Sequence, residues 1–307
     1  MASHLPRRVT GLVAATFTPL TEEGELNLSV IEPYINYLGK EQDVRNIFVN
    51  GTTGEGMSFS VEERKSLAAE WCLRAKGKMD YVIVHVGCLS LKDSMELAQH
   101  AGKVGADGIA VVSPSFFKPK TADALRLYLQ KVASAAPTLP FYYYHIPTLT
   151  GVNLLASDVC KGIKKLIPSF SGVKFTGTDL MDFGLCVKYS QAEHLLLYGI
   201  DEQLLTSLVL GANGAVGSLY NYLGRHYNKL LVAFAEGDLD SARACQFNVQ
   251  VFLAFASQYG FDVALNKQLM SDLSGLNLGP PRLPVIPCPS ATVATIAEKC
   301  RQIFLQN

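Results

Sequence analysis

A single lysine inside an apolar, β-rich run is the first candidate for covalent chemistry. Lys174 lies in the run from Gly172 to Phe175, without an adjacent acid. If its side chain points into a buried interior, desolvation lowers the pKa of the amine from about 10.4. A neutral amine can attack a ketone and form a Schiff base. The alternative is a strand-end lysine whose charge reaches water, and the residue taken by itself fits that alternative at least as well.

A tyrosine at the end of another strand-like run is a candidate for proton transfer. The segment Tyr142–Tyr143–Tyr144–His145–Ile146–Pro147 closes this run, and alternation sends neighbouring tyrosines to opposite faces. A phenol beside the Lys174 amine can carry a proton, provided that its pKa of about 10 is shifted or a substrate group assists. The alternative is that all three tyrosines are core or interface residues, and for Tyr142 and Tyr143 we adopt it.

Two threonines lie in a glycine-rich loop with the properties of an anion site. Thr52 and Thr53 belong to the segment 51–56, GTTGEG, between a predicted strand and a predicted helix. Glycines let the backbone approach a ligand, and consecutive N–H groups can surround an anion. The two hydroxyls add donors, which suits a carboxylate. The segment lacks the GK[ST] end of a P-loop, and an ordinary strand-to-helix turn is the alternative.

Acidic and hydroxyl side chains follow the last two strand-like runs. Asp201 and Glu202 come directly after Gly199 and Ile200, and adjacent carboxylates can accept hydrogen bonds from a polyhydroxylated substrate. Ser218 follows the next run. The alternative reading for Asp201 and Ser218 is that each caps a helix.

Metal sites and catalytic triads find little support. The six histidines show no HxH or HExxH spacing, and no GxSxG segment is present. The seven cysteines contain no CxxC pair, and their odd number argues against a disulfide framework. His85 and His145 are most simply strand histidines with satisfied hydrogen bonds. We therefore expect no metal and no cofactor.

Composition excludes several classes of protein. The 307 residues are 49% hydrophobic, which excludes disorder as the main state. Lys and Arg number 27, as do Asp and Glu, whereas a nucleic-acid-binding protein would carry a basic excess. No apolar run approaches the roughly 20 residues of a membrane helix, and the start MASHLPRRV lacks the apolar region of a signal peptide. We expect a cytoplasmic protein without nucleic-acid or membrane partners.

The strand-like runs predict the fold. Eight short runs, most of them continuously apolar as in parallel sheets covered on both faces, occupy residues 11–17, 46–50, 81–86, 108–113, 141–145, 172–175, 195–198 and 214–218. Helical patterns between them predict an α/β protein, a (β/α)8 TIM barrel over 1–225 with its site at the carboxyl ends of the strands. The rival, an open doubly wound sheet, would predict a GxGxxG loop after the first strand, and none is present.

Helix signals fit the same interpretation. Ser60 and Glu63 form a capping box for a helix through Lys76. Ser90 begins another predicted helix, and Gly102 and Gly105 mark its end. Thr121 begins a further one. Asp201 begins a short helix that ends near Gly211. Residues 226–307 carry only helical patterns, over 226–236, 238–257, 262–274 and 290–305. We interpret them as C-terminal helices packed on the barrel within one structural domain.

Four motifs in register resemble the N-acetylneuraminate lyase / dihydrodipicolinate synthase family of class I aldolases. They are GTTGE at 51–55, YHIP at 144–147, GVK at 172–174 and GIDE at 199–202, and the resemblance extends over essentially the whole chain. It implies a TIM barrel, a homotetramer and no metal. It further implies that Lys174 forms the Schiff base, that Tyr144 transfers protons and that Thr52 and Thr53 hold a pyruvyl carboxylate. Five residues would contact the sugar portion: Thr176, Gly199, Asp201, Glu202 and Ser218.

Two departures from the family pattern refine the expected activity. Many dihydrodipicolinate synthases have an arginine where this chain has Leu149, and a leucine cannot pair with a second substrate carboxylate. Cleavage of a sialic acid is therefore expected rather than condensation with a semialdehyde. Phe116 stands where many relatives place a tyrosine that reaches a neighbouring subunit. The alternatives are a lyase for another 2-keto-3-deoxy sugar acid and a non-catalytic barrel that binds a keto acid.

Overall fold

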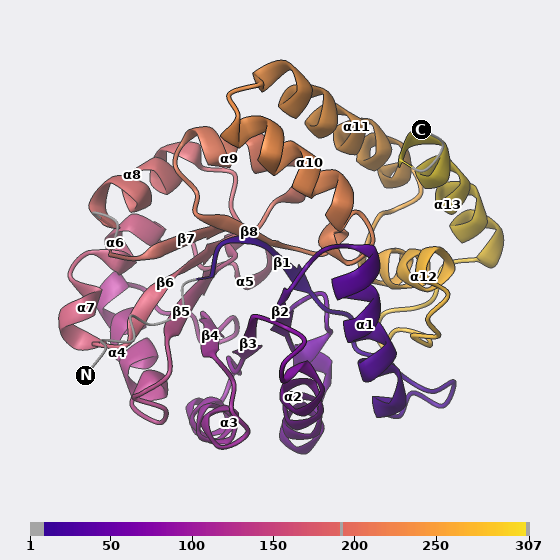
Figure 1. Ribbon diagram of the computed structural model, residues 1–307. Helices are drawn as coiled ribbons and strands as arrows, with labels where there is room; N and C mark the ends of the chain where they lie inside the picture. The colour runs from indigo at the N-terminus through magenta and orange to yellow at the C-terminus, as the bar shows by residue number, and fades with distance from the viewer. Residues whose placement is uncertain (1–8, 191–192, 305–307) are drawn as a thin grey trace.

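Eight parallel strands close into a barrel in the computed structural model, which describes residues 9–190 and 193–304. Each strand pairs with its neighbours in chain order, and β1 also pairs with β8, which closes the sheet (Figure 1). The strands are β1 (Gly11–Ala15), β2 (Asn46–Val49), β3 (Tyr81–His85), β4 (Gly108–Val112), β5 (Phe141–His145), β6 (Phe170–Phe175), β7 (Leu195–Tyr198) and β8 (Gly214–Gly217). The predicted barrel is thus confirmed, and the open sheet is excluded.

The strands are apolar on both faces because each face is covered. One set of side chains fills the barrel interior, and the other packs beneath the surrounding helices. On β5, Tyr142 and Tyr144 belong to the interior set and Tyr143 to the outer set. The alternation of a strand therefore turns Tyr144 toward the axis of the barrel.

Helices follow the strands and form the outer ring of Figure 1. Over the barrel they are α1 (Ile31–Glu41), α2 (Val61–Ala75), α3 (Leu91–Lys103), α4 (Ala122–Ala133), α5 (Pro147–Thr150), α6 (Ala156–Cys160), α7 (Ile163–Leu166), α8 (Leu180–Ser190) and α9 (Leu204–Val209). The predicted capping box is confirmed: Glu63 N–H donates to Ser60 Oγ at 3.2 Å, and Ser60 N–H donates to Glu63 Oε2 at 2.8 Å. Ser90 and Thr121 cap α3 and α4 by a single bond each, in which the side-chain oxygen accepts from the Asp93 N–H and the Ala124 N–H, respectively.

Some predicted boundaries differ from the structure. Gly102 lies inside α3, and the chain turns at Gly105, whose φ of 83° suits a residue without Cβ. Asp201 begins a 3-10 turn, Asp201–Gln203, and α9 then runs only to Val209. The amino-terminal prediction, that no signal peptide is present, rests mainly on residues 1–8, which lie outside the described residues.

Four helices complete the chain after β8. They are α10 (Gly224–Ala235), α11 (Leu239–Ser257), α12 (Val263–Ser274) and α13 (Ser290–Phe304), and in Figure 1 they are coloured orange to yellow. The last three run close to the predicted bounds. Because α10 begins just before residue 225, the division of the chain at that residue stays a prediction. In the described ranges, no helix combines the length and the apolar character needed to cross a membrane.

A buried tryptophan on α2 tests the packing of the outer ring. Trp71 is 1% exposed, and its ring lies edge-on to Tyr34 of α1 with centroids 5.4 Å apart. We expect Trp71→Ala to lower the free energy of unfolding by about 3–5 kcal/mol, because the cavity adds to the lost burial. Leu73→Ala, 63% exposed on the same helix, should change it by less than about 0.5 kcal/mol. Urea unfolding followed by circular dichroism measures both, and equal midpoints would contradict this packing.

Candidate active site

The Lys174 amine lies inside the barrel, between two aromatic rings. Lys174 on β6 pairs in register with Tyr144 on β5, so the two side chains leave neighbouring strands at the same level. The residue is only 5% exposed. Its Nζ lies 4.1 Å from the centroid of the Tyr144 ring and 4.3 Å from that of Phe48 on β2. The side chain is therefore enclosed by aromatic surface instead of extending to solvent on the outer wall.

The Tyr144 hydroxyl is held by the glycine-rich loop after β2. Its oxygen lies 3.0 Å from Thr52 Oγ1, a hydrogen bond in which either hydroxyl can donate. The Tyr144 ring also packs edge-on against Phe48, with centroids 5.8 Å apart. These contacts fix the phenol beside the lysine, so amine, phenol and threonine hydroxyl form one connected group.

The loop itself is tightly wound. Asn50 and Glu55 at its two ends adopt left-handed conformations, with φ of 61° and 54°, which few residues other than glycine tolerate. A Cβ on Gly56 would lie 2.0 Å from the Asn50 carbonyl oxygen, so only glycine fits there. Thr18 Oγ1 donates to the Gly54 carbonyl at 2.6 Å. The backbone therefore places Thr52 and Thr53 at the mouth of the barrel without freedom to rearrange.

Asp201 is buried at the carboxyl ends of β7 and β8. Its Oδ2 accepts a hydrogen bond from the Leu219 N–H at 2.9 Å. Burial raises the pKa of Asp201 to about 7, because desolvation disfavours the charged carboxylate. A Cβ on Gly217 would lie 1.6 Å from Asp201 Oδ1, so any other residue there would displace the Asp201 carboxyl. Asp201 thus has a buried, partly neutralised carboxyl rather than the plain helix-capping role considered from the sequence.

Thr176 and Gly199 approach each other closely. The Thr176 N–H donates to the His145 carbonyl at 2.7 Å, continuing the ladder between β5 and β6. Thr176 Oγ1 is buried and has no hydrogen-bond partner among the described residues. A Cβ on Gly199 would come within 2.0 Å of this oxygen. Gly199 therefore leaves room for a hydroxyl that is still available to a ligand.

Ser218 and Glu202 are tied to the C-terminal helices. Asn266 Nδ2 of α12 donates to Ser218 Oγ at 2.8 Å, which leaves the serine proton free for another acceptor. Gln250 Nε2 of α11 donates to the Glu202 carbonyl oxygen at 2.9 Å. The Glu202 side chain is partly exposed. Both residues line the same cavity as Lys174.

One cavity of about 390 Å³ brings all nine predicted site residues together. Its lining includes Lys174, Tyr144, Thr52, Thr53, Thr176, Gly199, Asp201, Glu202 and Ser218. It is large enough for a sugar acid. These nine residues come from five strand ends, as expected for the carboxyl-terminal face of a TIM barrel.

The sequence analysis missed several residues that line this site or support its amine. Phe48 supports the amine, and its position in an apolar strand gave no chemical signal. Leu253 and Ser257 of α11, and Phe261 just after it, line the cavity. These residues belong to the segment interpreted only as an appendage, and helical spacing does not indicate which face covers a barrel mouth.

His145 lies on the outer side of β5, away from the amine. Its Nδ1 is 3.3 Å from the Tyr143 hydroxyl, and its ring centroid is 4.8 Å from that of Phe175. Burial lowers the pKa of His145 to about 4, so the ring is neutral at neutral pH. His145 therefore supports the wall between β5 and β6, in keeping with a strand histidine.

A second cavity of about 350 Å³ shares Thr52, Tyr144 and Ile146 with the first. Its lining includes His85, whose Nδ1 lies 3.0 Å from the Asn50 carbonyl oxygen. Burial lowers the pKa of His85 well below its usual value, so Nδ1 carries the proton that it donates to this carbonyl. Its Nε2 has no partner in the described part of the chain, so only one of its nitrogens is satisfied.

Two residues that depart from the family pattern lie at the surface. Phe116 is 75% exposed and contacts Phe117 edge-on, with centroids 5.1 Å apart. Leu149 is 63% exposed and lines the second cavity. Neither side chain reaches Lys174 within its own chain, because neither lines the first cavity.

Comparisons with known proteins agree with this geometry. The model of the dihydrodipicolinate synthetase family matches residues 8–302. N-acetylneuraminate lyase of Danio rerio is 59% identical over 97% of each chain, and that of Homo sapiens is 56% identical over 91% of this chain and 88% of its own. The solved N-acetylneuraminate lyase of Proteus mirabilis superposes with a TM-score of 0.92 at 34% identity, covering 97% of this chain and 100% of its own. The chain therefore belongs to the dihydrodipicolinate synthetase family.

Proposed function

We propose that the protein is a Schiff-base aldolase that reversibly cleaves N-acetylneuraminate to N-acetylmannosamine and pyruvate. The observation that carries the proposal is the Lys174 amine, buried inside the barrel beside the Tyr144 phenol. Its relatives named N-acetylneuraminate lyase, similar over nearly their whole lengths, support the same substrate. The protein is accordingly a carbon–carbon lyase that requires no metal.

The reaction begins when the Lys174 amine, in its unprotonated form, attacks the C2 ketone of the open-chain sugar acid. Loss of water gives an iminium ion, whose nitrogen can accept an electron pair. When the C4 hydroxyl loses its proton, the C3–C4 bond breaks and its electrons flow to C3 and the iminium. N-acetylmannosamine leaves as the aldehyde, and the enamine of pyruvate remains on Lys174. Protonation at C3 and hydrolysis by water then release pyruvate and the free amine.

Tyr144 transfers the proton, acting together with the substrate carboxylate. The amine lies over the Tyr144 ring, 4.1 Å from its centroid, and the hydrogen bond to Thr52 at 3.0 Å offers the phenol a partner for the proton. Thr52 and Thr53 hold the carboxylate through their hydroxyls and the surrounding backbone. The tightly wound loop supports this role, because its orientation is fixed before substrate arrives.

The polar end of the cavity binds the sugar. Glu202 accepts hydrogen bonds from sugar hydroxyls, while the partly neutralised carboxyl of Asp201 can accept or donate. Thr176 and Ser218 each have hydrogen-bonding capacity that the protein leaves unused. With Leu149 in place of an arginine, the site offers hydroxyl-binding groups instead of a second carboxylate site. This pattern favours cleavage of a sugar acid over condensation with a semialdehyde.

The proposal includes a homotetramer in the cytoplasm. Phe116, Phe117 and Leu149 expose apolar surface, and assembly would remove such surface from water.

Reductive trapping tests the covalent intermediate. With pyruvate and borohydride, the wild-type protein should gain one pyruvyl adduct on Lys174, because borohydride reduces the iminium to a stable amine. Peptide mass spectrometry locates the adduct. Lys174→Met should form none and should lose cleavage of N-acetylneuraminate. A fully active Lys174→Met protein would rule the mechanism out.

Removal of the Tyr144 hydroxyl separates binding from proton transfer. Tyr144→Phe should still bind pyruvate but lose about 10²–10⁴ of kcat, the usual scale of general acid–base catalysis. Steady-state kinetics and trapping at saturating pyruvate measure the two effects. Thr53→Ser, which keeps a hydroxyl, is the matched control and should retain most of kcat. An unchanged kcat in Tyr144→Phe would remove Tyr144 from this role.

Substitutions at the acidic pair test the sugar end. Glu202→Ala and Asp201→Asn should reduce kcat/KM for N-acetylneuraminate by about tenfold or more. The first variant loses an acceptor for the sugar hydroxyls, and the second loses a carboxyl group that can accept or donate a proton. Trapping of pyruvate on Lys174 should change little, since pyruvate does not reach these residues. Equal losses in the two assays would point to a structural role instead.

A further inference from the structure

Two adjacent residues of α12 reach two different sides of the active-site mouth. Asn266 donates to Ser218 after β8, and Lys267 forms an ion pair with Glu55 of the glycine-rich loop after β2. In the barrel β1 alone separates β8 from β2, so α12 spans this part of the rim. Successive helical residues point about 100° apart, which allows one turn of helix to serve both.

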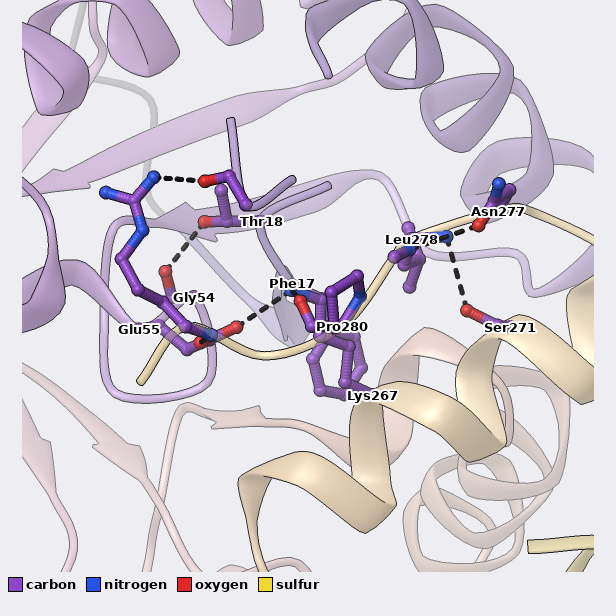
Figure 2. A network of polar contacts seen from close by, with 12 residues as sticks. Phe17, Thr18, Gly54, Glu55, Lys267, Ser271, Asn277, Leu278 and Pro280 are labelled. Carbon is purple, nitrogen blue, oxygen red and sulfur yellow. Dashed lines mark hydrogen bonds and ion pairs between the residues drawn. The ribbon is translucent and has the colours of Figure 1, made fainter. Parts of the chain in front are cut away.

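The Lys267–Glu55 ion pair is completely enclosed. Lys267 Nζ lies 2.9 Å from Glu55 Oε1, with the two side chains 0% and 3% exposed. The same ammonium donates to the Pro280 carbonyl oxygen at 2.9 Å, as Figure 2 shows. Glu55 Oε2 accepts the Arg282 N–H at 2.6 Å. Both charges are thus paired and hydrogen-bonded, the condition under which a buried ion pair is tolerated.

The contacts around the ion pair extend to α2, the helix that follows the loop. Arg282 Nη1 lies 2.5 Å from Glu63 Oε1, the carboxylate that completes the capping box of α2. Its guanidinium also stacks over the Phe59 ring at 4.4 Å. The segment from α12 to Arg282 therefore holds the glycine-rich loop at Glu55 and also holds the start of α2. Between these anchors and Asn50 lie Thr52 and Thr53.

The Asn266 contact is separate from the ion pair. Asn266 Oδ1 accepts a hydrogen bond from the buried Tyr222 hydroxyl at 2.9 Å, which fixes the orientation of the amide. Its Nδ2 then points at Ser218 Oγ. No residue of the ion pair takes part, so the two contacts can be broken independently.

We propose that α12 is a positioning element of the active site, in which Lys267 aligns the carboxylate-binding loop and Asn266 aligns Ser218 at the sugar end. Neither residue lines the cavity, so each acts through the residue that it holds. This inference rests on the proposed function, because it assigns pyruvate and the sugar to the two ends of the site.

Kinetics in the direction of synthesis, with pyruvate and N-acetylmannosamine, separate the two roles. Lys267→Met should raise KM for pyruvate roughly tenfold or more, because misplacing a binding group by about 1 Å costs one to two orders of magnitude. KM for N-acetylmannosamine should stay within about twofold in that variant. Asn266→Ala should show the reverse: KM for N-acetylmannosamine should rise, and KM for pyruvate should stay within about twofold. General loosening of the fold would move both constants together.

The next residue of α12 provides a matched control. Gln268 exchanges two hydrogen bonds with the backbone of Cys288, at 3.0 and 2.7 Å, on a face away from the mouth. Gln268→Ala should leave both KM values within about twofold, the change expected of a residue that holds no part of the site. Glu55→Gln, which keeps the size and an acceptor oxygen of Glu55, should raise KM for pyruvate if Lys267→Met fails to fold.

The outcomes are distinguishable. A wild-type protein that gives no pyruvyl adduct would overturn the proposed function. A wild-type protein that gives the adduct, with variants whose two KM values are unchanged or rise in parallel, would overturn the positioning role of α12. A Gln268→Ala protein in which KM rises for one substrate and not for the other, as in Lys267→Met or Asn266→Ala, would overturn it as well.

Discussion

The enclosure of one amine by aromatic rings is the constraint on which the site depends. The Lys174 amine lies over the faces of Phe48 and Tyr144, and these rings shield it from water inside the barrel. Parallel pairing makes this possible, because Lys174 and Tyr144 stand opposite each other in the register of β5 and β6. A shift of β6 by one residue would turn Lys174 toward the outer helices, the side on which His145 lies.

Close backbone approach is the second requirement. Around the mouth, the side chains of Asp201 and Thr176 fill space that a Cβ at Gly217 or Gly199 would occupy. Glycine loses more conformational freedom on folding than other residues do. At these positions it lets carboxyl and hydroxyl groups pack directly against the backbone. The raised pKa of Asp201 follows from the same packing, since water is excluded from its carboxyl.

The sequence predicted the barrel well because the strand signal is local. Continuous apolar runs such as Tyr81–His85 and the capping box at Ser60 need no tertiary information, and both are confirmed. Lys174, Tyr144 and Asp201 were selected because they stand at strand ends, whereas Thr176 and Gly199 came from the family resemblance alone, and the structure places all of them around one cavity. Phe48 and Phe261 were missed because a phenylalanine looks the same whether it fills a core or supports an amine. Gly102 was misread because a helix that packs well tolerates an interior glycine.

The contribution of α12 illustrates why such contacts escape a linear reading. Glu55 and Lys267 are 212 positions apart in the chain, and neither has a neighbour that predicts its partner. A buried ammonium is unfavourable unless a carboxylate meets it, so the pair is meaningful only after the barrel has brought β2 and the C-terminal helices together. Function thus depends on the last helices as well as on the barrel: a segment that supplies no reacting atom fixes the loop that is to receive the substrate carboxylate.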